Sequence, residues 1–302
     1  MNFRQIEFFI HVAESGSFSR ASGVIGLTQP AISRQVSALE RELRLRLLHR
    51  NGRGVVLTDA GQRFLVYAKG ILHQLEGARH AVTGNEADIT GKVAVGLPAS
   101  LGQVLTLPLV KAFRERYHEA DLAIVEALSV PLQERLLAGR LDAAVVHNPT
   151  PSPLLKIEPM LTESLCLLSP ANGASSRAVP FQALANFELI FPGAPHPIRS
   201  SVEAEALRRG IKLRVVLEID AIGTSLQLVA EGYGHAVVPY NVVRAGMSGS
   251  GIVARQIVRP SLGSTVALIT PARRPMTRLA DGVAEILRQV LRRTLPGPLR
   301  KH

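Results

Sequence analysis

The sequence predicts an α+β protein with three successive parts, and three observations support this fold class. Residues 3–58 show helical spacing of apolar residues, interrupted by short turns, and end in a hairpin signal. Residues 59–83 carry one long helical repeat, and from residue 92 short apolar runs alternate with helical segments. Such alternation is typical of a largely parallel sheet with helices on both faces. We therefore expect a helical N-terminal domain, a long connecting helix and a C-terminal α/β domain.

The composition is that of a globular chain with room for two or three domains. Of its 302 residues, 46% are hydrophobic and 20% are charged, which is not the composition of a disordered chain. No apolar run approaches the roughly 18–20 residues of a membrane span, and the N-terminus lacks the pattern of a signal peptide. The single cysteine, Cys166, leaves no internal disulfide and too few thiols for a cysteine zinc site. We expect a cytoplasmic protein without a membrane partner.

The net charge of +11 is concentrated at the two ends of the chain. Residues 1–58 hold eight arginines against four acids, and residues 268–302 hold eight bases against two acids. These sets contribute +4 and +6, which leaves +1 for the other residues. A basic segment indicates contact with a polyanion. Since solvated side chains explain the C-terminal set more simply, charge alone does not locate a nucleic-acid site.

The N-terminal pattern is typical of a helix-turn-helix. Two short helical segments and a tight turn precede a third helix, which Thr28 is placed to cap. The third helix of this motif enters the DNA major groove, where Gln can pair with adenine and Arg with guanine. A solvated helix face is the alternative for its outward polar residues. The residues that we assign to double-stranded operator DNA on this helix are Gln29, Pro30, Ser33, Arg34 and Ser37.

A hairpin follows this helix at residues 47–58. Asn51 and Gly52 form a strong two-residue turn signal, and Arg50 and Arg53 flank it. A basic hairpin beside a recognition helix is a wing, whose arginines reach phosphates or the minor groove. The sequence therefore predicts a winged helix-turn-helix with Arg50 and Arg53 as further DNA contacts.

The long helix that follows is predicted to pair two chains. Its apolar positions have spacings of 4, 3, 4, 3 and 4, which is a heptad pattern. A protein that reads two operator half-sites needs a two-fold partner. The alternative is a helix packed on its own domain. The predicted dimer positions are Phe64, Ala68, Ile71, Leu75, Ala78 and Val82.

The C-terminal part offers several ligand contacts just after predicted strands. In α/β sheets, ligands bind outside the carboxyl ends of strands and near helix N-termini. Simple N-capping is the alternative for the hydroxyl residues, and a structural hydrogen bond is the alternative for each histidine. Arg199 and the helix start at Ser100 suggest an anionic ligand. The candidate effector contacts are Ala99, Ser100, Ser129, His147, His196, Arg199, Ile222 and Thr224.

The sequence does not support an enzyme. It lacks a phosphate-binding loop, a Gly-x-Ser-x-Gly elbow, a zinc pair of the His-Glu-x-x-His type and a dinucleotide fingerprint. Cys166 lies in an apolar run, as expected of an inert core residue. We expect no catalytic residue, no metal and no cofactor. A DNA-binding oligomer whose C-terminal part binds no ligand is a further alternative.

The first 65 residues resemble the winged helix of LysR-type transcriptional regulators. The resemblance is carried by segments 17–21, 28–35, 39–40, 47–50 and 57–61, and it departs from the family at Gly23, in a segment that is usually alanine-rich. Residues 137–145 and 228–239 likewise match recurring segments of the family's C-terminal domain. The stretches 151–153 and 192–199 look most like the branch that contains the nitrogen assimilation control regulators.

The resemblance implies a domain plan and a set of partners. It implies a DNA-binding domain at 1–58, a dimerisation helix at 59–83, a hinge linker at 84–91 and an effector domain at 92–302. That last domain would resemble periplasmic binding proteins, with subdomain I at 92–162 and 268–295 and subdomain II at 163–267. A small-molecule effector would bind in the cleft between the subdomains. The expected assembly is a homodimer or homotetramer, with RNA polymerase as a further partner.

Overall fold

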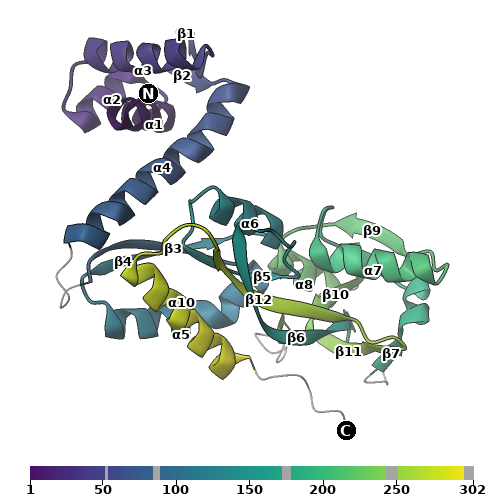
Figure 1. Ribbon diagram of the computed structural model, residues 1–302. Helices are drawn as coiled ribbons and strands as arrows, with labels where there is room; N and C mark the ends of the chain where they lie inside the picture. The colour runs from purple at the N-terminus through teal and green to yellow at the C-terminus, as the bar shows by residue number, and fades with distance from the viewer. Residues whose placement is uncertain (52–53, 84–88, 172–177, 243–250, 296–302) are drawn as a thin grey trace. The chain divides into compact units, whose positions relative to one another are not determined.

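The computed structural model describes residues 1–51, 54–83, 89–171, 178–242 and 251–295 (Figure 1). The chain divides into two compact units, one formed by residues 1–84 with 138–140 and the other by 85–137 with 141–302. Among the described helices, none has the length and apolar character needed to cross a membrane.

The first unit contains three helices, a two-stranded hairpin and a long helix. The three helices begin and end at local signals in the sequence. Asn2 and Gln5 form a reciprocal cap at the first helix, which ends at Gly16 with φ 61°. Ser17 then caps the second helix by accepting the backbone N–H of Arg20. The elements are α1 (Phe3–Ser15), α2 (Phe18–Ile25), α3 (Gln29–Leu43), β1 (Leu48–Asn51), β2 (Gly54–Leu57) and α4 (Asp59–Thr83).

Helix α4 packs on its own unit along much of the predicted dimer seam. The side chains of Phe64, Ala68 and Ile71 join the core formed by α1, α2 and α3, and Ala68 is fully buried there. The rings of Phe64 and Phe9 lie 5.2 Å apart between centroids in an edge arrangement. Ala68 is therefore covered by its own unit, whereas Phe64 and Ile71 remain partly exposed, so the seam between two chains stays a prediction. Leu75 is half-buried, Ala78 is exposed and the side chain of Val82 is outside the described set.

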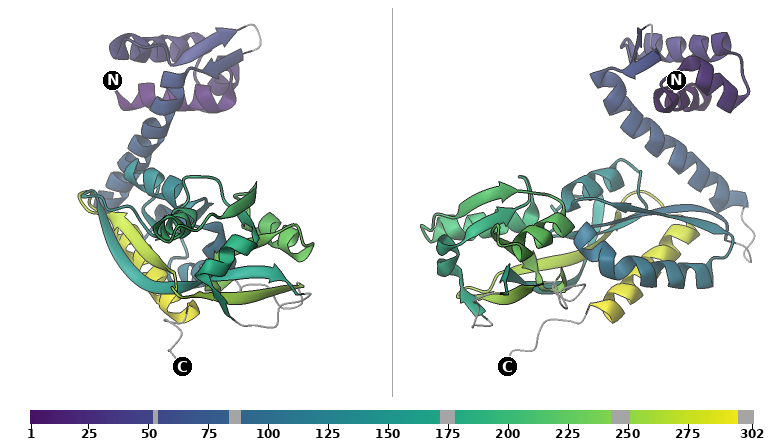
Figure 2. Two further views of the ribbon diagram at one scale, coloured as in Figure 1. Left: turned by 90° about the vertical axis from the view of Figure 1, so that its right-hand side faces the viewer. Right: turned by 180° about the vertical axis from the view of Figure 1, so that it is seen from behind.

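The second unit is built on one mixed sheet of ten described strands (Figures 1 and 2). The strand order is β4-β3-β5-β12-β6-β10-β8-β9, with β11 beside β6 and β7 beside β11. The strands are β3 (Gly91–Leu97), β4 (Ala120–Glu126), β5 (Ala143–His147), β6 (Leu155–Pro170), β7 (Ala178–Pro180), β8 (Glu188–Phe191), β9 (Arg214–Glu218), β10 (His235–Pro239), β11 (Ile252–Val258) and β12 (Gly263–Pro271).

The sheet has two parallel halves joined by antiparallel strands. β3 pairs in parallel with β4 and β5 in the first half, and β8 pairs in parallel with β9 and β10 in the second. β6 is antiparallel to β12 over residues 155–164 and to β10 and β11 over 165–170, so it belongs to both halves. The sequence predicts a largely parallel sheet. Parallel pairing occurs within each half, whereas the strands that join the halves pair antiparallel.

Helices cover both faces of each half, as the alternating pattern predicts. In β5 the side chains of Ala143 and Val145 face the core under α5 and α10, while Ala144 and Val146 face the core under α6. In the second half, α7 and α8 cover opposite faces in the same way. The helices are α5 (Ala99–Arg116), α6 (Ser129–Leu137), η1 (Phe181–Asn186), α7 (Pro197–Arg208), α8 (Ile222–Ala230) and α10 (Arg278–Thr294).

Candidate functional site

The first candidate surface is the outer face of α3. Ile32, Val36 and Leu39 are fully buried and fix the helix on α1, so the opposite face is turned to solvent. On that face Gln29, Pro30 and Arg34 are exposed, whereas Ser33 and Ser37 are half-buried. Thr28 occupies the N-cap position with extended backbone, but its side chain makes no capping hydrogen bond, contrary to the expectation. The N-terminal part of α3 therefore presents side chains in the pattern used for reading base edges.

A buried carboxylate attaches the wing to this helix. Glu40 is 5% exposed, and its Oε1 accepts the backbone N–H groups of Leu47 at 2.8 Å and Leu48 at 3.1 Å. These bonds hold the start of β1 against the end of α3. Arg50 lies on β1, but its side chain and all of Arg53 are outside the described residues. The sequence interpretation assigned no role to Glu40, since a carboxylate on a helix is usually solvated.

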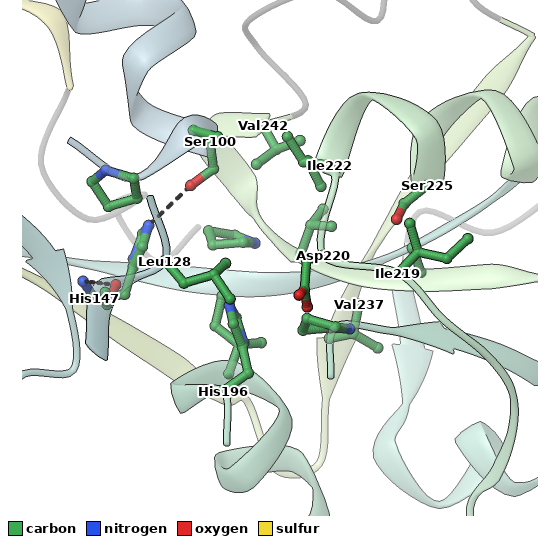
Figure 3. A pocket seen from close by; sticks show the side chains of 18 of the residues that line it. Ser100, Leu128, His147, His196, Ile219, Asp220, Ile222, Ser225, Val237 and Val242 are labelled. Carbon is green, nitrogen blue, oxygen red and sulfur yellow. Dashed lines mark hydrogen bonds between the residues drawn. The ribbon is translucent and has the colours of Figure 1, made fainter. Parts of the chain in front are cut away.

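The second candidate site is a pocket within the second unit, shown in Figure 3. Its cavity volume is about 80 Å³. It lies at the start of α5, α6, α7 and α8 and is closed by side chains of β8 and β10. The lining residues are Pro98, Ala99, Ser100, Leu128, Ser129, His147, Ile190, Pro192, His196, Ile198, Ile219, Asp220, Ile222, Ser225, Ala236, Val237, Val238, Pro239 and Val242.

His147 is the centre of a hydrogen-bond network at one wall of this pocket. Its Nε2 lies 3.3 Å from the hydroxyl of Ser100, and its Nδ1 lies 3.1 Å from that of buried Ser264. Its backbone N–H donates to Ser129 Oγ at 3.0 Å. Burial, assisted by the nearby ring of His196, lowers the pKa of His147 to about 4. The imidazole is therefore neutral at pH 7, and both of its ring nitrogens already have partners.

His196 and Asp220 form the polar part of the opposite wall (Figure 3). Burial lowers the pKa of His196, and the carboxylate of Asp220 opposes that change. The His196 Nδ1 atom is buried and has no hydrogen-bond partner within the described part of the chain. One oxygen of Asp220 accepts the backbone N–H of Gly193 at 2.9 Å, which fixes the carboxylate at the edge of the pocket. This wall therefore offers the Asp220 carboxyl group, since the His196 Nδ1 atom is itself buried.

Six of the eight predicted effector contacts line this pocket, and two do not. Ala99, Ser100, Ser129, His147, His196 and Ile222 line it, whereas Arg199 and Thr224 do not.

Arg199 is held outside the pocket by two acids and a carbonyl. Its Nε donates to Glu203 at 2.7 Å, and one terminal nitrogen donates to Glu218 at 2.8 Å and to the Pro192 carbonyl at 3.0 Å. The expected anion contact by Arg199 is therefore wrong in this geometry, because its charge is already neutralised. Thr224 lies on the exposed face of α8.

The sequence interpretation missed the pocket residues that come from strand interiors. Ile190 and residues 236–239 of β10 look like ordinary core in the sequence, since nothing in a buried strand distinguishes a cavity wall from a packed contact. Asp220 follows β9 and could have been found by the same rule that located Ile222.

Two family matches cover most of the chain. Residues 3–62 match the bacterial regulatory helix-turn-helix protein family of the lysR type, and residues 86–292 match the LysR substrate binding domain. The chain therefore belongs to the LysR family. It is a DNA-binding transcriptional regulator with a ligand-binding type of C-terminal domain.

Individual relatives agree with this assignment over nearly the full length. The nitrogen assimilation regulatory protein nac of Escherichia coli (strain K12) is 33% identical, and the match covers 96% of this chain and 95% of that protein. A full-length OxyR variant from Pseudomonas aeruginosa has a TM-score of 0.73 at 23% identity, with coverage of 98% and 96%. Full-length CbnR in complex with its target DNA has a TM-score of 0.69 at 25% identity, with coverage of 96% and 100%. Both the nac protein and BbuR of Bordetella bronchiseptica, which is 30% identical over 95% of this chain, are transcriptional regulators.

Proposed function

We propose that the first unit reads double-stranded operator DNA with the outer face of α3 and the wing. The observation that carries this proposal is the exposed N-terminal face of α3, beside a hairpin anchored by Glu40. Full-length CbnR, whose fold this chain shares, has been solved in complex with its target DNA. The proposed contacts are Gln29, Pro30, Ser33, Arg34, Ser37, Arg50 and Arg53.

The pocket of the second unit is the proposed effector site. It is concave, largely apolar and has a few convergent polar groups, which is the usual character of a small-molecule site. Ligand binding between the two halves of the sheet would change their angle and, through it, DNA bending or contact with RNA polymerase. Such coupling typically amounts to about 1–3 kcal/mol between sites.

The domain plan that accompanies this proposal has four parts. Residues 1–58 bind DNA, 59–83 form the connecting helix, 84–91 the hinge linker and 92–302 the effector domain. The protein would act in the cytoplasm as a homodimer or homotetramer. Since Ala68 is buried in its own unit, pairing would use the parts of α4 that stay exposed, including Tyr67 and the exposed surface of Phe64 and Ile71.

The DNA proposal is tested with Arg34→Ala. The preferred sequence is first obtained by genome-wide mapping of bound DNA, and affinities are then measured on that site and on single-base variants. Loss of a bidentate contact should cost about 1–3 kcal/mol and relax specificity at one base pair. Arg114→Ala removes the same charge from an exposed position of α5 and should leave affinity within twofold. Equal loss on every sequence would instead assign Arg34 to phosphate, and unchanged binding would contradict the proposal.

The effector proposal is tested with a matched pair of tryptophan variants on α8. Ile222→Trp puts a large ring into the pocket, whereas Thr224→Trp adds the same ring on the exposed face two residues away. Ligands are sought by thermal shift against a broad library of small molecules. Stabilisation by a true effector should disappear in Ile222→Trp and persist in Thr224→Trp. If no compound stabilises the protein, the DNA-binding oligomer without a ligand becomes the better description.

A further inference from the structure

The pocket has a strongly uneven distribution of charge. No lysine or arginine occurs among its described lining residues, and Arg199 is held away by Glu203 and Glu218. Both histidines have lowered pKa values and are neutral at pH 7. Asp220, which is exposed at the edge of the pocket, is the acidic side chain among the described lining residues. A ligand that carries only negative charge would meet this carboxylate without any cationic side chain to balance it.

A positive potential is nevertheless present at the other wall. The first turns of α5 and α6 reach the pocket through Ala99, Ser100 and Ser129. Each helix N-terminus carries roughly half a positive charge and unpaired backbone N–H groups. A carboxylate fits this wall. Since the Asp220 carboxyl lies on the opposite wall, the pocket favours a group with hydrogen-bond donors and positive charge at its other end.

The aliphatic surface of the pocket and the cavity volume restrict the hydrocarbon part of the ligand. The aliphatic lining residues are Leu128, Ile190, Ile198, Ile219, Ile222, Val237, Val238 and Val242. A bound water needs roughly 10–15 Å³ of cavity volume. A cavity of about 80 Å³ is therefore several times the minimum for one water and suits a small ligand. A molecule of that size with two opposite charges has room for a short branched hydrocarbon.

We propose that the effector is a small aliphatic α-amino acid of about the size of valine. Its carboxylate would lie against the first turns of α5 and α6, its ammonium group against Asp220, and its side chain against the aliphatic residues. This inference rests on the proposed effector function of the pocket. In this arrangement Asp220 contacts the ammonium group, so this residue favours an amino acid over a carboxylic acid that lacks the amine.

The test uses the full-length protein and a set of compounds that share one branched hydrocarbon group. The set is L-valine, 3-methylbutanoate, which lacks the amine, 2-methylpropylamine, which lacks the carboxylate, and D-valine. Binding is measured by isothermal titration calorimetry. L-valine should bind at least tenfold more tightly than each of the other three, and Ile222→Trp should abolish this binding.

Asp220→Asn tests the assigned role of the carboxylate. It should lower the affinity for L-valine about tenfold and leave that for 3-methylbutanoate unchanged or increased. Asp121→Asn, at an exposed position of β4, is the control and should change neither. The inference is overturned if 3-methylbutanoate binds as tightly as L-valine, if Asp220→Asn has no effect, or if no member binds. In the last case the pocket still stands as an effector site if the library yields a ligand that Ile222→Trp excludes and Thr224→Trp retains.

Discussion

Ionisation of Glu163 should make the stability of the second unit depend on pH. This side chain lies on β6, where that strand passes from one half of the sheet to the other, and it is 5% exposed. One carboxyl oxygen accepts a hydrogen bond from Asn241, and Oε2 has no partner among the described residues. Burial raises the pKa of Glu163 from 4.5 to about 7, and the contact with Asn241 opposes the increase.

The sign and size of the effect follow from linkage. The folded state holds the Glu163 proton more tightly than the unfolded state does. This contribution to stability is therefore fully present below pH 4.5 and is lost as the pH rises through 7. At 1.36 kcal/mol per pH unit, the interval from 4.5 to 7 corresponds to about 3 kcal/mol in all. Between pH 5 and pH 8 the change should be roughly 2.5 kcal/mol.

Glu163→Gln isolates this contribution, because glutamine resembles the protonated acid at every pH. Urea unfolding followed by circular dichroism at pH 5, 6, 7 and 8 gives the free energy of unfolding of both proteins. The variant should gain roughly 2.5 kcal/mol relative to the parent across this range. His147 acts in the opposite sense, since its lowered pKa removes stability as the pH falls from 6.5 toward 4. That contribution is common to both proteins and cancels in the difference.

The reasoning would be refuted by a difference between the two proteins that stays constant from pH 5 to pH 8. It would also be refuted by a difference that grows in the acidic direction. Glu134→Gln, at an exposed position of α6, is the control for loss of a carboxylate without burial. A comparable pH-dependent gain in that variant would show that general surface charge, and not Glu163, is responsible.

Three further predictions concern single contacts. Glu40→Ala leaves two backbone N–H groups of the wing unpaired, so DNA affinity measured by fluorescence anisotropy should fall at least tenfold, and unchanged affinity would contradict the anchoring role. Phe64→Ala should cost about 3–5 kcal/mol of unfolding free energy because the ring is packed on α1, whereas Tyr67→Ala, 63% exposed, should cost little in chemical denaturation. His147→Phe should cost about 1–3 kcal/mol by leaving the hydroxyl of Ser264 unpaired, and adding Ser264→Ala should recover part of that loss in a double-mutant cycle.

The sequence predicts the elements of the first unit well because their signals are local. Caps such as Ser17, the glycine at position 16 and the spacing of buried residues in α3 each act over a few residues. The heptad pattern of α4 is different. It shows that Phe64, Ala68 and Ile71 share one apolar face, but the spacing does not show whether α1 of the same chain or a second chain covers that face. Here the intramolecular contact is observed.

The pocket was predictable only where it follows strand ends. Ser100, Ser129, His147 and His196 satisfy the general rule for α/β sheets, and they do line the cavity. Arg199 also follows a strand end, but it does not line the cavity. One of its acidic partners, Glu218, is 19 residues away and comes close through the pairing of β8 with β9. The neutralisation of a charge depends on such topology, so a sequence pattern cannot show it.

The buried polar contacts of Glu163 and Ser264 were also not predicted, because they depend on the pairing of the two strands that join the halves. In the sequence, Glu163 looks like a solvated interruption between two apolar runs of a strand. In the structure it stands opposite Ser264 in the ladder between β6 and β12, where the sheet changes from one half to the other. Ser264 bonds to His147 at one wall of the pocket, and Glu163 bonds to Asn241, which precedes the pocket residue Val242. Both of these buried polar contacts therefore start from the same pair of facing positions on the joining strands.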